Sequence, residues 1–160
     1  MKKIIYKLTY LTALFAFIYS CDDVERVYYN DAAETVLSLS DDNLILNEEN
    51  AANEILTLTW TEPDFGFSAA ALYSVQIDVQ GGDFSNPQII SVGGAFDKTF
   101  TVEELNAKLL SLSMVPNEEG VASFRIKATL SEYQEIYSNT VNISVTPVSY
   151  THLRAHETGY

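Results

Sequence analysis

The chain has 160 residues, of which 47% are hydrophobic, so it is long enough to bury one ordinary core and too short for two large domains. The 22 Asp and Glu against 9 Lys and Arg give a formal net charge of −13, which argues against nucleic acid as a partner because a phosphate backbone requires a basic surface. Cys21 is the single cysteine, so no disulfide can form within the chain and no thiolate metal cluster is available.

Residues 1–20 are predicted to be a lipoprotein signal peptide. A positive n-region opens it, with Lys2, Lys3 and Lys7. The uncharged run Leu8–Tyr19 follows, and it is shorter than the about 20 apolar residues that span a bilayer. This run ends in the sequence IYSC, which resembles a bacterial lipobox with a small residue before Cys21. We therefore expect cleavage before Cys21 and lipid attachment at its thiol. Several acyl chains at this position would anchor the protein durably to a membrane. An ordinary secretory signal with an incidental cysteine is the alternative.

Residues 21–33 are predicted to be a lipid-anchored linker, because they show little periodicity. The acidic residues that follow the cysteine resemble a signal for export to the cell surface in glycan-foraging Gram-negative bacteria; they are Asp22, Asp23 and Glu25. Tyr28 and Tyr29 lie in the same linker. We expect these tyrosines to pack on the neighbouring domain, with stacking on a sugar as the alternative.

Residues 34–147 are predicted to form an all-β, immunoglobulin-like or fibronectin III-like β-sandwich with one short helix. Apolar and polar residues alternate over several short segments separated by turn formers, which is the period of strands with one buried face. The predicted strands are Thr35–Leu39, Leu44–Leu46, Ile55–Trp60, Tyr73–Val79, Gln88–Val92, Lys98–Thr101, Ala122–Leu130 and Val141–Thr146, and residues 131–134 are assigned to a connection.

The helix is predicted to begin at Thr101, which can cap it with Glu104 as the capping-box partner. Apolar residues then recur at helical spacing and predict a stripe that packs on the sandwich, namely Val102, Leu105, Leu109 and Leu112. Pro116 is predicted to end the helix.

Residues 148–160 are expected to be foreign to the natural protein. The run Val148–Thr158 has no strand alternation and resembles the in-frame translation of a transposase-type sequencing-library adapter. We therefore expect the natural reading frame to continue past Thr146. Both histidines, His152 and His156, fall in this tail. The natural part then lacks the histidine needed by serine or cysteine nucleophile systems and by histidine-ligated zinc.

The oxygen-bearing side chains predict no catalytic, metal or cofactor site. A glycosidase needs two carboxyl groups about 5–10 Å apart, but Asp64 is expected in a loop and Asp78 on the solvent face of a strand. The segments Asp41–Asn43 and Asn47–Asn50 lack the spacing of a calcium loop, so turn chemistry explains them better. Trp60 is in register with buried leucines, so we expect it in the core rather than on a carbohydrate platform.

The segment LTWTEPDFGFSAAALYSVQIDV, followed by the turn Gly82–Pro87, resembles the amino-terminal domain of the SusE family of starch-utilisation outer-membrane lipoproteins. The helix TVEELNAKLLSL, the strand SFRIKATL and the run Tyr137–Asn139 before VNISVTP fit the same family, so the resemblance covers Leu44–Pro147. It implies a non-enzymatic, surface-exposed lipoprotein of the outer membrane. Its implied partners are a TonB-dependent transporter and a SusD-like lipoprotein of a glycan-uptake locus.

In that family the amino-terminal immunoglobulin-like domain is a spacer, and glycan is bound by modules further along the chain. We expect these modules to lie beyond Thr146 and to be missing here, so no carbohydrate-binding residue of the family can be carried onto this chain. Lipid attachment at Cys21 does carry over. The expected function is the spacer domain of a surface glycan-binding lipoprotein. The alternative is an adhesion or protein-binding module, and an enzyme with a carboxylate pair is more distant.

Overall fold

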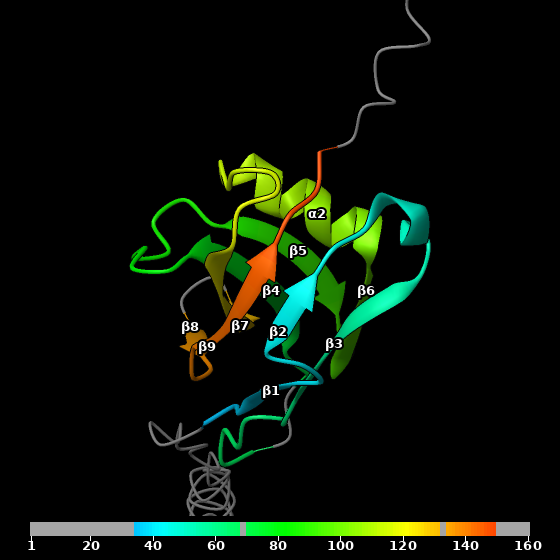
Figure 1. Ribbon diagram of the computed structural model, residues 1–160. Coiled ribbons are helices and arrows are strands. Elements are labelled where there is room, and N and C mark those ends of the chain that lie inside the picture. The colour runs from blue at the N-terminus through cyan, green and yellow to red at the C-terminus, as the bar shows by residue number, and fades with distance from the viewer. Residues whose placement is uncertain (1–33, 68–69, 132–133, 150–160) are drawn as a thin grey trace, which may run out of the picture.

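The computed structural model describes residues 34–67, 70–131 and 134–149 (Figure 1). In these residues the chain forms nine strands, the helix α2 (Val102–Ser111) and the short 3-10 helix η1 (Glu48–Asn50). The strands are β1 (Leu37–Leu39), β2 (Asn43–Ile45), β3 (Glu54–Trp60), β4 (Leu72–Val79), β5 (Gln88–Gly93), β6 (Asp97–Thr101), β7 (Gly120–Ser131), β8 (Gln134–Tyr137) and β9 (Val141–Thr146). This arrangement confirms the predicted β-sandwich with one short helix.

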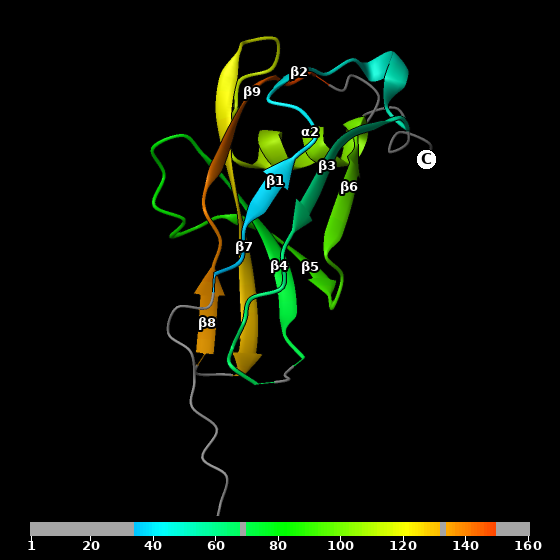
Figure 2. The same cartoon turned by 90° about the horizontal axis from the view of Figure 1, so that it is seen from below.

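The strands form two sheets. The smaller sheet has the order β1-β3-β6, and the larger has the order β2-β9-β7-β4-β5, with β8 pairing with β7 as well. Figure 2 shows β1, β3 and β6 side by side in one layer. The entering chain therefore supplies an edge strand to each sheet, β1 to the smaller and β2 to the larger. The described part enters at the bottom of Figure 1 and leaves at the top, so its two ends lie at opposite ends of the sandwich.

The core lies between the sheets and follows the two-residue period of the strands. On β7 the alternating side chains of Ala122, Phe124, Ile126 and Ala128 are all completely buried. They face fully buried residues of β3 and β6, including Leu58 and Phe100. Burial of apolar side chains is the main stabilising term for such a sandwich, at about 1.5–3 kcal/mol for each large one.

Thr101 caps the helix as its sequence predicts, while the carboxylate of Glu104, the predicted capping-box partner, pairs with Lys98. The Thr101 hydroxyl accepts a hydrogen bond from the Glu104 N–H at 3.2 Å, and Lys98 Nζ lies 2.8 Å from Glu104 Oε2. Leu105 and Leu109 are completely buried on the predicted stripe. Asn106 is completely buried beside them, which the apolar pattern did not predict. Among the residues that the structure describes, no helix is long and apolar enough to cross a membrane.

The strand β8 is an element that sequence reasoning missed. The connection was assigned to residues 131–134, but Gln134 is already paired with Ser131, and β8 continues to Tyr137. Its four residues carry a single aliphatic side chain, Ile136, which lies opposite Ala128 of β7. So short and polar a segment has no periodic signal, and its pairing with the long strand β7 is what makes it a strand.

Candidate functional site

The outer face of β4 and β7 is covered around Asp78, which the sequence predicted to face solvent. Gln76, Asp78 and Ser123 are only 5%, 8% and 5% exposed. The prediction that Asp78 lies on a solvent face is therefore wrong. At Asp78 the cause is the loop after β4, residues 81–87, which folds back onto its carboxylate, and the alternation within β4 carries no information about that loop.

Asp78 holds this loop in place. Its Oδ1 accepts a hydrogen bond from the Val79 N–H at 2.8 Å, and its Oδ2 accepts one from the Phe84 N–H at 2.9 Å. Phe84 has a φ of +56°, a backbone conformation that costs energy for a residue with a side chain. The hydrogen bond to a carboxylate offsets part of that cost and holds the Phe84 backbone in this conformation.

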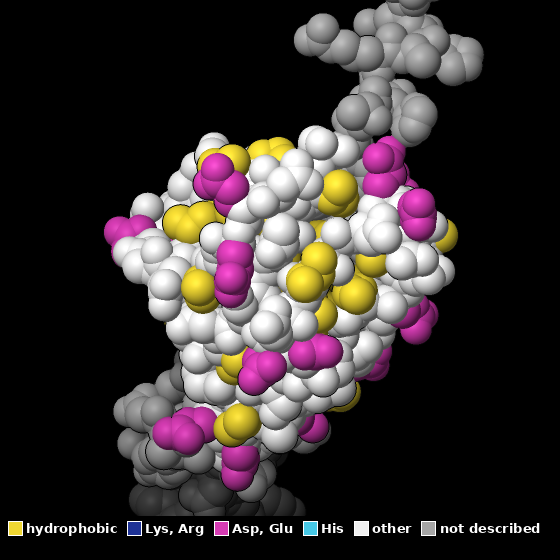
Figure 3. Space-filling view, in the orientation of Figure 1, with side chains coloured by type: hydrophobic (Ala, Val, Ile, Leu, Met, Phe, Trp, Pro, Cys, Tyr) yellow, Lys and Arg dark blue, Asp and Glu magenta, His cyan; other side chains and the backbone are white. Residues whose placement is uncertain are grey.

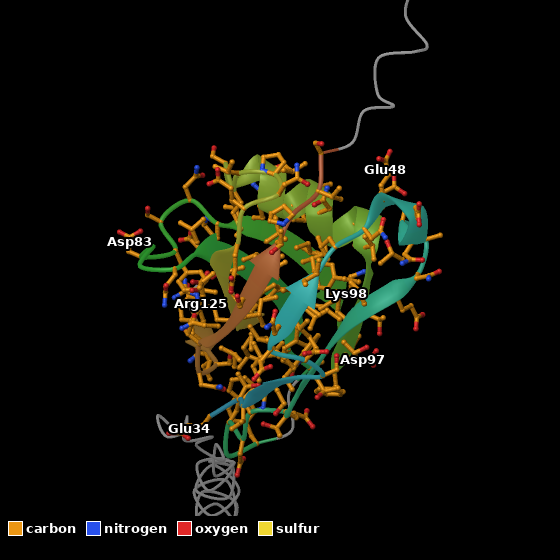
Figure 4. The ribbon with its side chains drawn as sticks, in the orientation of Figure 1. Glu34, Glu48, Asp83, Asp97, Lys98 and Arg125 are labelled. Carbon is orange, nitrogen blue, oxygen red and sulfur yellow. The ribbon has the colours of Figure 1, made fainter. Side chains whose placement is uncertain are left out.

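The loop places Phe84 on Arg125 of β7. The Arg125 Cζ lies 4.1 Å from the centre of the Phe84 ring and 4.2 Å from the centre of the Tyr137 ring of β8. Its Nε also donates a hydrogen bond to Gln76 Oε1 at 2.7 Å. Cation–π contacts of this kind contribute about 0.5–2 kcal/mol each. We call Phe84, Arg125 and Tyr137 the arginine–aromatic cluster; Figure 4 shows Arg125 on the same side of the sandwich as Asp83 of the loop.

Charged neighbours extend this cluster along β8. The Tyr137 hydroxyl donates to Glu135 Oε2 at 2.8 Å, and Glu135 also forms a salt bridge with Lys127. The hydrogen bond to Glu135, together with burial, raises the pKa of Tyr137. Hydrogen bonds from Lys127 and Tyr137 lower the pKa of Glu135. The arrangement fastens the loop and β8 to the sheet, and the guanidinium is already enclosed by two rings and an amide.

Trp60 lies in the core, as predicted. It is 5% exposed, its ring lies 6.0 Å from that of Tyr73, and Tyr73 lies 5.3 Å from Phe96. The Nε1 of Trp60 and the hydroxyl of Tyr73 are buried without a hydrogen-bond partner. Burial, and to a lesser extent the charge of Glu62, raises the pKa of Tyr73. A buried ring of this kind offers no open face to a sugar.

The remaining oxygen-rich residues act in local turns. Asp64 Oδ1 accepts from the Gly66 N–H at 2.8 Å, in the loop where it was predicted. Asp41 Oδ1 accepts from the Asp42 and Asn43 N–H groups, and Asn47 caps η1. In the described part of the chain no group of at least three His, Cys, Asp or Glu side chains is placed to hold a metal ion.

Cys21, the predicted lipid attachment site, lies outside the described residues, as do the linker residues Tyr28 and Tyr29. His152 and His156, which are expected to be foreign, also lie outside them.

Two asparagines hold the chain where it enters and leaves the domain. Asn139 accepts from the Leu37 N–H at 2.8 Å and donates to the Leu37 C=O at 3.2 Å. Asn106 does the same for Val148, accepting from its N–H at 2.9 Å and donating to its C=O at 2.7 Å. Each side chain therefore pairs with both backbone polar groups of one residue, as a neighbouring strand would. We call Asn139 and Asn106 the entering and leaving clamps. Sequence reasoning missed both, since each joins segments far apart in the chain.

The surface is acidic on the face of β2 and β9. Figure 3 shows Asp and Glu side chains spread around small hydrophobic patches, and no Lys or Arg of the described residues is visible on this face. Together with the formal net charge of −13, this distribution repels anionic surfaces such as lipid headgroups.

Comparison with known proteins identifies the family. The model of the family described as "SusE outer membrane protein" matches residues 22–127. No curated protein matches the chain. Among solved structures, a computationally redesigned β-sandwich protein is similar with 14% identity and a TM-score of 0.40, over 72% of this chain and 91% of that one. The periplasmic chaperone SfaE is similar with 15% identity and a TM-score of 0.34, over 72% of this chain and 58% of that one. Because the family model spans more than half of the sequence, including the sandwich from β1 into β7, the chain belongs to the SusE outer membrane protein family.

Proposed function

We propose that the protein is the membrane-proximal spacer domain of a non-catalytic, surface-exposed glycan-binding lipoprotein of the outer membrane. The observation that carries this proposal is the position of the two ends of the domain, which lie at opposite ends of the sandwich and are each held by an asparagine clamp. A domain tied down in this way keeps the preceding and the succeeding segments of the chain a fixed distance apart.

Four parts of the chain have separate roles under this proposal. Residues 1–20 are the signal peptide, residues 21–33 carry the lipid on Cys21 and act as a linker, residues 34–147 form the spacer, and residues 148–160 are the foreign tail. Sugar-binding modules come after the spacer in the natural protein. The lipid fixes one end, and the linker and sandwich hold the modules away from the membrane, which raises the local concentration of captured glycan.

The partners are inferred from the same assignment. SusE-family membership supports an outer membrane protein of a polysaccharide-utilisation system. We propose that the full-length protein works beside a TonB-dependent transporter and a SusD-like lipoprotein. Glycan reaches it through the downstream modules under this proposal, which is supported by the burial of Trp60 and Tyr73 in the core and by the packing of Phe84 and Tyr137 against Arg125.

The test has two arms on the expressed full chain. Mass spectrometry of the mature protein should find an acylated amino-terminal Cys21, and Cys21→Ser should abolish acylation and release the protein from the membrane fraction. A free, unmodified thiol at Cys21 contradicts the anchor. Pull-down with insoluble starch should recover no more of this chain than of an unrelated acidic protein. Turnover of a glycan, or clear retention on starch, contradicts the spacer role, and a single protein captured stoichiometrically would favour the adhesion module instead.

A further inference from the structure

The second strand of the domain and its last strand are paired in parallel. β2 and β9 have Asn43 opposite Ser144 and Ile45 opposite Thr146. Hydrogen bonds extend the ladder at both ends, from the Ser144 N–H to the Asp42 C=O at 2.9 Å and from the Leu46 N–H to the Thr146 C=O at 3.1 Å. Every other strand pair in the described residues is antiparallel. Figure 1 shows β2 and β9 side by side at the front of the larger sheet.

Parallel pairing at these two strands determines how a pull on the chain is carried. A force on the entering end reaches β2 through β1, and it draws β2 toward its amino-terminal end, while a force on the leaving end draws β9 toward its carboxyl-terminal end. Because the strands run in the same direction, they can separate only by sliding past each other, and sliding strains all the bonds of the ladder together. A pull applied at the same end of both strands would instead open the bonds one after another.

The clamps add contacts on the path of the force at either side of this ladder. Before β2, the chain passes Leu37, which is held by Asn139 and paired with Trp60 of β3. After β9, the Pro147 C=O accepts from the Asn117 N–H at 2.7 Å, and Val148 is held by Asn106. The ladder therefore has a fixed point beyond each of its ends.

We propose that this domain is a mechanical link. It resists tension between its ends because that tension loads the hydrogen bonds between β2 and β9 in shear. The tension would come from a captured polymer that pulls away from the membrane. That source rests on the proposed spacer function, whereas the resistance itself depends only on the strand arrangement.

The test compares two pulling directions in the same fold by single-molecule force spectroscopy. The full chain carries Cys21→Ser, so that handles attach only at introduced cysteines, and Asp42→Cys is present in both versions. In the first, Ser149→Cys places the second handle beyond the carboxyl-terminal end of β9. In the second, Thr140→Cys places it at the amino-terminal end of β9. Asp42, Thr140 and Ser149 are all exposed, and neither direction alters the core.

We expect a several-fold higher unfolding force for the 42–149 direction than for the 42–140 direction, because forced unfolding reports the barrier along the direction pulled. Equal forces, or a higher force for 42–140, would overturn the inference. A proline pair gives a second readout in the 42–149 direction. Leu46→Pro removes a ladder donor and should lower the force below that of Leu46→Ala, which loses the same core side chain but keeps the N–H. Ile45→Pro, whose N–H points away from β9 by the alternation of the strand, should keep the force. A lower force for Ile45→Pro than for Leu46→Pro would also contradict the inference.

The two proposals fail separately. The pulling experiment needs neither lipid nor glycan, so an unacylated Cys21 leaves its outcome unchanged. Equal forces in the two directions would in turn leave the lipoprotein assignment standing.

Discussion

Gly82 is predicted to be the position in the loop over β4 where a single methyl group does most damage. A Cβ at this position would lie 2.4 Å from Asp78 Oδ2, 2.6 Å from its Cγ and 2.8 Å from its Oδ1. The carboxylate cannot easily move aside, because Oδ2 accepts from the Phe84 N–H and Oδ1 from the Val79 N–H. Gly82→Ala should therefore lower the free energy of unfolding by about 1–3 kcal/mol, the usual cost of forcing an extra methyl into an occupied space.

A double-mutant cycle separates this clash from other effects of alanine. Asp78→Ala alone should cost about 1.5–3 kcal/mol, because two backbone donors lose a charged acceptor. In that background the obstacle is gone, so Gly82→Ala should cost little, and the coupling energy should approach the cost of the single Gly82→Ala change. Gly94→Ala is the matched control: its Cβ would meet no atom within 4 Å, so its effect should stay within about 0.5 kcal/mol.

Urea denaturation followed by Trp60 fluorescence gives all four corners of the cycle, because the indole is buried in the core. The reasoning fails if Gly82→Ala is as mild as Gly94→Ala. It also fails if the full cost of Gly82→Ala persists when Asp78 is alanine, since the carboxylate would then not be the obstacle.

Three further predictions concern the core and the clamps. Trp60 fluorescence should be blue-shifted and unchanged by maltoheptaose, and quenching by the sugar would contradict its core position. Tyr73→Phe removes an unpartnered buried hydroxyl and should be neutral or stabilising by up to about 1–3 kcal/mol in thermal or urea unfolding. The pKa of Tyr73 in the folded protein is raised from 10.0, so its protonated form contributes stability that is complete below pH 10.0 and is lost as the pH rises through the folded pKa. Tyr73→Phe should reduce this loss of stability at alkaline pH. An unchanged dependence of stability on pH would contradict this expectation. Asn139→Ala should cost about 1–3 kcal/mol and speed amide exchange at Leu37, while unchanged exchange there would show that the clamp does not hold β1.

The central strands could be predicted from sequence because their signal is local. Alternation in β3 and β9 reflects one buried face, and the cap at Thr101 is set by residues three apart, so both are visible within a short window. The outer face of β4 could not be predicted in the same way. Asp78 alternates with apolar residues as a solvent-facing residue would, and it is buried only because the loop after β4 covers it.

The arginine–aromatic cluster and the clamps share the same difficulty. Phe84, Arg125 and Tyr137 come from a loop and two strands, and only the pairing of β7 with β8 brings the last two together. Asn106 sits on a helical stripe of leucines, where a single polar residue gives no hint that it binds a backbone 42 positions away. Contacts of this kind depend on how distant elements meet, and no short window contains them.

The leaving clamp has a consequence for how such proteins can be assembled. Asn106 bonds only to the N–H and C=O of the residue at position 148, and these groups are the same in every residue except proline. The contact therefore does not depend on side-chain identity, and it accepts Val148, a residue that we expect to be foreign. Recombination just after Pro147 would leave the docking of the outgoing chain intact. Chimaeras that exchange the segment beyond this point should keep this backbone contact, and an apolar residue at position 148 would also keep the packing of Val148 against the core.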